Sequence, residues 1–120
     1  MTTKTFESWF KKLKDIWEQK RPNEILNICA DNFAWYETSF DKPYTSKEKL
    51  LNDWQGILNQ DNIKVDIKVL AVNNDLGIAN WKASFKRLPS NEKVVLDGIF
   101  AVRLNKEERC TEFRQWRSIK

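Results

Sequence analysis

The 120-residue sequence contains no histidine, the side chain that most often carries out acid–base chemistry near neutral pH. Any catalysis by this chain therefore has to use carboxylates, lysine, arginine or water. Histidine is also a common metal ligand, and the two cysteines, Cys29 and Cys110, lie too far apart in the sequence to form a metal-binding pair. We expect no metal site.

Glycine and proline are scarce, with three residues of each. The sequence has no glycine-rich phosphate loop, no nucleophile elbow and no catalytic cysteine paired with a base. We also expect no bound organic cofactor. The sequence also has no apolar run near the roughly 18 residues that cross a bilayer, and its N-terminus shows no secretory signal. These absences predict a single cytoplasmic domain over residues 1–120, with reduced, buried cysteines and no membrane contact.

Acidic and basic residues are nearly balanced, with 17 of the former and 21 of the latter. Bases such as Lys11, Lys14 and Arg21 are interleaved with acids, which is typical of a solvated surface. Nucleic-acid binding requires clustered positive charge, so we do not expect it here. Hydrophobic residues make up 41% of the chain, a globular composition that argues against disorder.

Six tryptophans are the most unusual residues that the chain does contain. Each lies on the apolar side of its expected helix or strand. Any one of them can simply fill the core, but a small domain rarely needs so much aromatic volume for that purpose. Their number therefore predicts a deep pocket or cleft with aromatic walls.

The spacing of apolar residues changes along the chain and predicts helices first, then strands. A period near 3.6 indicates helices over 5–20, from Pro22 to near 30, and from a capping box at Thr45 and Glu48 to near 59. An aromatic run over 33–37 predicts a short strand. Strict alternation then predicts four long strands, connected by short turns into an antiparallel meander, over 63–69, 79–85, 94–105 and 110–119.

The third of these long strands is apolar on both faces. Phe100 lies on one face, while Val95, Ile99 and Ala101 lie on the other, to which alternation also assigns Phe113. A sheet covered by helices on one side needs only one apolar face. The second apolar face therefore predicts a homodimer formed through the convex side of the sheet, with scattered surface residues as the alternative.

This pattern resembles the nuclear transport factor 2-like superfamily, which includes the SnoaL-like and ketosteroid-isomerase-like proteins. The resemblance covers nearly the whole chain and is carried by the helix with Trp54 and by ADNFAW (30–35) leading to ETSF (37–40), IANW (78–81), LDGIF (96–100) and CTEFRQW (110–116). It implies an α+β fold of the cystatin-like roll type. In that fold a cone-shaped, curved antiparallel sheet carries the N-terminal helices over its concave face, and the convex face commonly forms a dimer.

Transferred position by position, the resemblance predicts the lining of the pocket. Trp17 closes the narrow end or the rim, and the remaining residues are Trp35, Glu37, Trp54, Trp81, Phe100, Glu112, Arg114 and Trp116. Alternation gives the same sets, unless a β-bulge exchanges the faces.

The family's isomerases keep a general-base aspartate on the first short strand, where this chain has Glu37 in one alignment and Thr38 in another. Their second acid corresponds to Phe100, so we do not expect that isomerase chemistry. Glu37 in an aromatic cavity would have a raised pKa, which suits a general base. Arg114 either binds a substrate anion or forms a structural ion pair with Glu37 or Glu112.

Three functions follow from these patterns. The first is a pocket protein that binds a small apolar or amphipathic molecule. The second is a cofactor-free isomerase, dehydratase or cyclase that uses Glu37 as its general base. The third is a dimerisation or partner-binding module without a ligand. The sequence does not decide whether the chain is an enzyme, because this fold hosts many unrelated activities.

Overall fold

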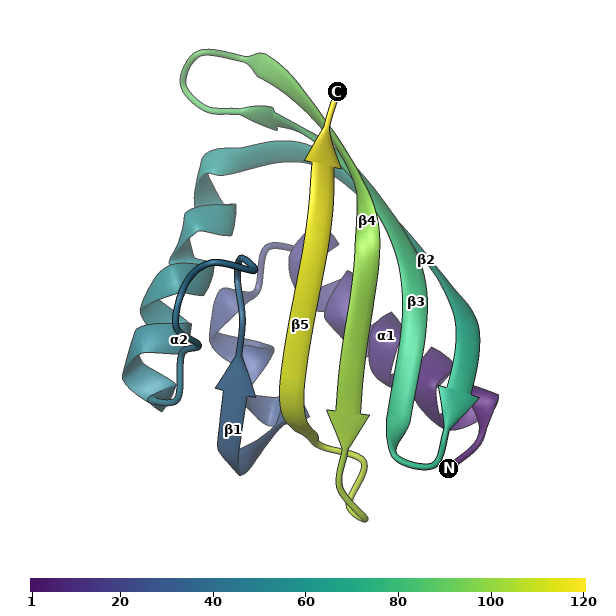
Figure 1. The fold of residues 1–120 in the computed structure, drawn as a ribbon. Helices are drawn as coiled ribbons and strands as arrows, with labels where there is room; N and C mark the ends of the chain where they lie inside the picture. The colour runs from purple at the N-terminus through teal and green to yellow at the C-terminus, as the bar shows by residue number, and fades with distance from the viewer.

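The computed structural model describes residues 1–120 and consists of helices packed on one side of a five-stranded sheet (Figure 1). Its elements in chain order are α1 (Thr3–Glu18), the 3₁₀ helix η1 (Pro22–Ile28), β1 (Cys29–Trp35), α2 (Lys47–Trp54), the 3₁₀ helix η2 (Gln55–Asn59), β2 (Gln60–Asn73), β3 (Leu76–Arg87), β4 (Glu92–Leu104) and β5 (Cys110–Ile119). This arrangement confirms the predicted α+β fold class. None of the helices has both the length and the apolar character needed to cross a bilayer.

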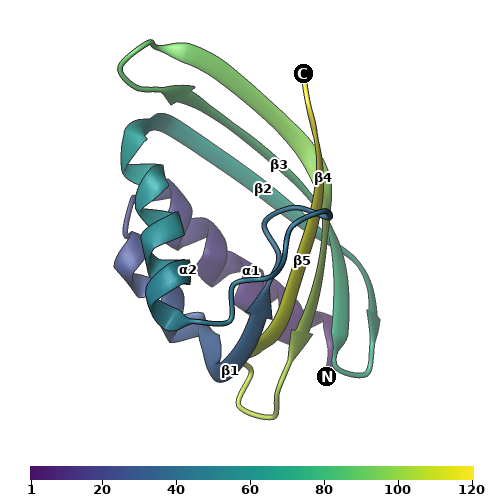
Figure 2. The ribbon, with the colours of Figure 1, turned by 60° about the vertical axis from the view of Figure 1, so that its left-hand side comes forward.

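The sheet has the strand order β1-β5-β4-β3-β2. Strands β2 to β5 pair antiparallel with their sequence neighbours, as the short turns predict. Strand β1 instead pairs parallel with β5, so the sheet is mixed. The long strands curve, and the helices lie against their concave side (Figure 2).

Both α-helices begin at hydroxyl caps. Thr2 caps α1 in a capping box with Thr5, and the helix buries an apolar stripe that includes Trp9 and Phe10. Helix α2 is capped by Ser46, whose hydroxyl accepts the backbone N–H of Lys49, so the predicted cap at Thr45 was one residue early. The last turn of the predicted third helix is the separate 3₁₀ helix η2.

The two cysteines lie side by side, although they are distant in the sequence. Cys29 on β1 is opposite Cys110 on β5, and both are buried, free thiols, as predicted. Burial raises the pKa of Cys29 to about 12 and also raises the pKa of Cys110. Both side chains therefore stay protonated and act as small core residues.

Candidate functional site

The concave side of the sheet brings together most of the predicted aromatic residues. Trp35 and Trp54 meet edge to face with their centroids 5.9 Å apart, and Trp81 stacks on Phe100 at 4.8 Å. Trp17, near the end of α1, contacts both Trp54 and Trp81, at 6.3 and 5.9 Å. These five side chains therefore lie together on the concave side of the sheet.

The prediction for strand β5 was wrong about its face. Phe100 lies opposite Gln115 in the sheet, and Val102 lies opposite Phe113, so Gln115 and Phe113 point inward and are buried. The three predicted pocket residues of this strand, Glu112, Arg114 and Trp116, lie on the convex face. The cause is an irregularity in register between Arg103 and Leu104, which exchanges the faces of the following strand.

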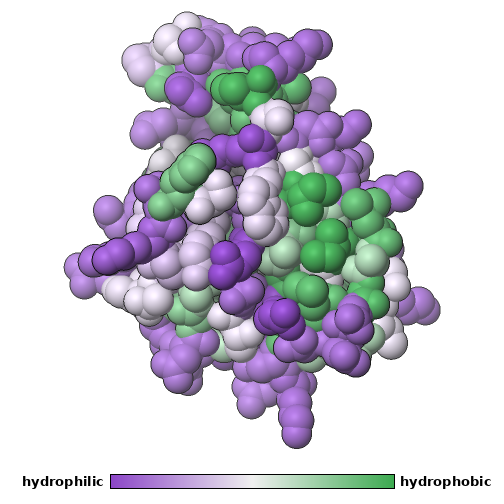
Figure 3. Space-filling view, in the orientation of Figure 1, coloured by the Kyte–Doolittle hydropathy of each residue, from purple (hydrophilic) through white to green (hydrophobic).

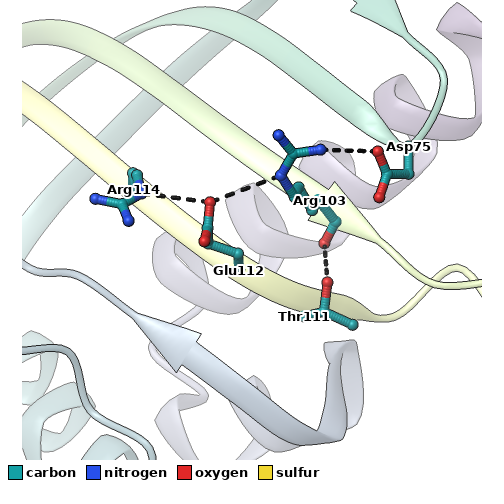
Figure 4. A network of polar contacts seen from close by, with 5 residues as sticks. All are labelled: Asp75, Arg103, Thr111, Glu112 and Arg114. Atoms are coloured by element: carbon teal, nitrogen blue, oxygen red, sulfur yellow. Dashed lines mark hydrogen bonds and ion pairs between the residues drawn. The ribbon is translucent and has the colours of Figure 1, made fainter.

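The charged residues of β5 form a network with neighbouring side chains on the convex face (Figure 4). Arg103 bonds Asp75 at 2.9 Å and lies 3.8 Å from Glu112, which also pairs with Arg114 at 3.3 Å. The Arg114 guanidinium also lies over the ring of Tyr36, 3.9 Å from its centroid. The structural alternative, a Glu112–Arg114 pair, is therefore the one observed, and Arg114 does not contact Glu37.

The aromatic residues of the concave side pack against one another. Trp35 stacks on Phe113 with centroids 3.8 Å apart, and Trp81 and Phe100 are nearly parallel, with 2° between their planes. Two cavities, of about 310 and 410 Å³, lie between α1 and β2 and along β2 to β4, and neither is lined by a tryptophan. In this conformation the structure does not show the predicted open pocket.

Glu37 is held at the border of this aromatic cluster, directly after β1. The Trp35 indole Nε1 donates to one carboxyl oxygen at 2.9 Å, and the Gln115 amide donates to the other at 3.2 Å. The side chain is half-buried. Arg117, also on the concave face of β5, donates to the backbone carbonyl of Glu37 at 3.4 Å. Both carboxyl oxygens are thus oriented from two neighbouring strands.

Asp53 of α2 lies near Glu37, and its negative charge acts on the Glu37 carboxyl. The Tyr44 hydroxyl donates to Asp53 at 3.1 Å, and the backbone of Tyr44 is paired with Trp35 at 2.9 and 2.8 Å. Burial is the main reason that the pKa of Glu37 rises from 4.5 to about 7. The charge of Asp53 raises this pKa further, whereas the Trp35 hydrogen bond and Arg117 lower it.

With its pKa near 7, the Glu37 carboxyl exists in both its protonated and its ionised form near neutral pH, so it can accept or donate a proton there. A buried carboxyl group whose pKa lies near neutral pH is suited to acid–base catalysis. For a metal ion, Glu37 and Asp53 offer only two side chains, and no group of three or more potential ligands converges in the structure.

Sequence reasoning missed Asp53, Tyr44 and Gln115. Asp53 directly precedes Trp54 in a helix that was predicted, so a polar residue beside a buried indole was the available signal. Its approach to Glu37 depends on how α2 lies over β1, which the periodicity of a helix does not encode. Gln115 was missed together with the face of β5.

Comparisons with known proteins agree with this fold. Residues 10–113 match the SnoaL-like domain family. The solved structure of SalBIII, described as an epoxide hydrolase/cyclase-like enzyme with a role in pyran ring formation in the polyether salinomycin, is similar with a TM-score of 0.78. The match covers 96% of this chain and 88% of that one, and the 9% identity supports a shared fold alone. Comparison with curated proteins finds no match.

Proposed function

Because the chain belongs to the SnoaL-like family, we propose that it binds a small, largely apolar molecule on the concave side of the sheet and acts on it by proton transfer. The fold alone does not select a reaction. The observation that carries the proposal is Glu37, which is held by Trp35 and Gln115 at the border of an aromatic interior and whose pKa is raised to about 7, mainly by burial.

In the proposed step, the ionised Glu37 carboxylate accepts a proton from a C–H or O–H group of the bound molecule. The protonated Glu37 then gives this proton to another atom of the same molecule, so Glu37 returns to its starting charge without a cofactor. Trp35 and Gln115 keep Glu37 in position through this exchange, and Tyr44 does the same for Asp53. The scheme covers isomerisation, dehydration and cyclisation, including chemistry of the kind named for the SalBIII enzyme.

A screen of small ring compounds by tryptophan fluorescence, followed by product analysis, tests this function. We expect Glu37→Gln to lower turnover of any converted compound by about 10²- to 10⁴-fold, the usual contribution of a general acid or base. It should also remove the apparent pKa near 7 from the pH–rate profile. Glu112→Gln, on the convex face, is the matched control and should retain activity.

Equal turnover by the wild-type protein and Glu37→Gln would refute the catalytic role and leave ligand binding as the function. If no compound of the library changes the tryptophan fluorescence, both the catalytic role and the ligand binding are refuted. Binding without catalysis is the second candidate, because Trp17, Trp54 and Trp81 form a continuous aromatic group that contains a half-buried member.

We also propose that the convex face forms a homodimer. This face carries Ile99 opposite Trp116, which is 45% exposed, and Leu70, which is 54% exposed. In the space-filling view, hydrophobic side chains gather over the long strands (Figure 3). Contiguous apolar surface of this kind usually marks a contact.

Sedimentation velocity tests the dimer. We expect Trp116→Glu to shift the protein toward a monomer, because burying an unpaired carboxylate in an apolar contact is costly. Leu58→Glu, which changes a 47%-exposed side chain on η2, is the control and should leave the sedimentation coefficient unchanged. A wild-type monomer at every concentration would rule out this dimer.

A further inference from the structure

Three lysines from neighbouring strands line one small cavity near the hairpin that joins β3 to β4. They are Lys64 on β2, Lys86 on β3 and Lys93 on β4, which we call the lysine cluster, and Asn62 and Ser84 lie beside them. The cavity has a volume of about 140 Å³, and no acidic side chain lines it. This part of the hairpin extends beyond the end of β5 (Figure 1), so the cavity lies at a free end of the sheet.

The pairing of the strands places the three lysines on the convex face. Lys86 and Lys93 are direct partners in the pairing of β3 with β4, and Lys93 precedes the buried Val94, so this pair points away from the concave side. Lys64 is the partner of Ser84, two residues before Lys86, and is therefore a diagonal neighbour of Lys86. Like charges that lie directly opposite each other destabilise a sheet, and long side chains also reach their diagonal neighbours. The cluster is therefore an unfavourable arrangement as it stands.

The next lysine on this face shows the usual arrangement. Lys82 is the sheet partner of both Asp66 and Asp97, and its ammonium group lies 4.0 Å from the Asp97 carboxylate. The three lysines of the cluster, in contrast, take part in none of the ion pairs of the structure. Asp61 is the β2 partner of Lys86, but it forms no ion pair with it and does not line the cavity. The positive charge around the cavity is thus uncompensated.

The chemistry of the cluster favours a tetrahedral dianion. Each of the three ammonium groups can contact a different oxygen of one phosphate group, and lysine commonly binds phosphate as a compact charge. The Ser84 hydroxyl and the Asn62 amide add neutral donors at the same cavity. A carboxylate has one charge and two oxygens, so it would leave at least one lysine without a partner. Nucleic acid, in turn, requires a row of cations that follows several phosphates, and this cavity offers a single position.

We propose that the lysine cluster binds the phosphate group of a phosphate monoester. The proposal does not depend on the proposed function, because the cavity and the Glu37 site lie on opposite faces of the sheet. It is also compatible with the proposed dimer. Lys93 lies near the start of β4, roughly 20 Å along the strand from Ile99 at the usual rise per residue, so the two sites use different parts of the convex face.

A titration of the full-length protein with glycerol 3-phosphate, followed in ¹H–¹⁵N spectra at constant ionic strength, tests the site. We expect saturable shifts of the backbone amides of Ser84, Lys86 and Lys93. Glycerol, which lacks the phosphate, should cause none, and sodium chloride of matched ionic strength should not reproduce them. Co-sedimentation with vesicles that contain phosphatidic acid forms a second arm, because this lipid presents the same monoester as its headgroup.

Substitutions at exposed positions show which lysines bind the phosphate. We expect Lys86→Gln and Lys93→Gln each to weaken the binding of glycerol 3-phosphate about tenfold, the size of one modest hydrogen bond to a charged group. Lys68→Gln is the matched control, because Lys68 is exposed, lies on the same strand as Lys64 and does not line the cavity. It makes the same change in net charge and should alter the affinity by less than about twofold.

Each outcome decides the proposal. Saturable binding of glycerol 3-phosphate that Lys86→Gln and Lys93→Gln weaken and Lys68→Gln preserves supports a site for a soluble monoester. Binding to phosphatidic-acid vesicles alone, with the same dependence on the variants, supports the site with a lipid headgroup as its ligand. Shifts that any salt reproduces, equal effects of Lys68→Gln and Lys86→Gln, or no binding in either arm would overturn the proposal and leave the role of Glu37 untouched.

Discussion

Replacing Glu37 with glutamine is expected to abolish a loss of stability that the wild-type protein shows as the pH rises from about 4.5 to about 7. In this range the unfolded chain has released the Glu37 proton, but the folded protein retains it. The folded state binds more protons there, so its free energy of unfolding falls as the pH rises. The contribution of protonated Glu37 to the free energy of unfolding is fully present below pH 4.5 and is lost above pH 7.

The effect is large for a single side chain. A shift from 4.5 to about 7 corresponds to roughly 3 kcal/mol of unfolding free energy. Glutamine stays neutral at every pH, so we expect Glu37→Gln to be about 2–3 kcal/mol more stable than the wild-type protein at pH 8 and similar to it at pH 4.5. Urea unfolding across this range measures the difference. A difference in unfolding free energy between the wild-type protein and Glu37→Gln that stays constant with pH would contradict the raised pKa of Glu37. Glu112→Gln is the control.

Replacing Gly98 with alanine is expected to destabilise the protein by about 3 kcal/mol or more, because the added methyl group has no space. The new Cβ would overlap the backbone carbonyl of Trp116 on β5 and would lie 2.8 Å from Trp81 Nε1. The first neighbour is sheet backbone and cannot move aside without distorting the β4–β5 pairing.

Gly56 provides the matched control for this prediction. It lies in η2, where an added Cβ would meet nothing within 4 Å and φ is not positive. Gly56→Ala should therefore be neutral or slightly stabilising. Thermal unfolding of both variants measures the contrast. Equal melting temperatures for the two would show that the close approach around Gly98 is absent in solution.

The fold was largely predictable because its patterns are local. The stripe of α1 from Phe6 to Ile16 and the alternation along β3 follow from the repeat lengths of helix and strand. Short turns between the long strands also fixed their antiparallel order. The parallel pairing of β1 with β5 was not predicted, because it joins segments from opposite ends of the chain and no local turn specifies it.

The candidate site was only partly predictable, for two physical reasons. Alternation along β5 sorts its side chains into two sets, but the irregularity beside Leu104 decides which set faces inward. The partners of Glu37 come from three different elements: Trp35 from β1, Asp53 from α2 and Gln115 from β5. A sequence shows that such groups exist, whereas packing decides which of them meet.

The candidate site combines a packed aromatic interior with polar side chains at its border, and the two parts share residues. Trp35 shows this directly, because its ring stacks on Phe113 while its N–H orients Glu37. Burial that stabilises the core also keeps the Glu37 proton in place near neutral pH. The same packing that stabilises the fold therefore also gives Glu37 a pKa suited to proton transfer near neutral pH.

A ¹³C NMR titration of the Glu37 side-chain carboxyl in the wild-type protein tests the central claim most directly. Burial of Glu37 beside the Asp53 charge predicts a midpoint near 7, and a lower midpoint in Asp53→Asn, where the neighbouring charge is removed. A midpoint near the ordinary value of 4.5, unchanged by Asp53→Asn, would contradict the account.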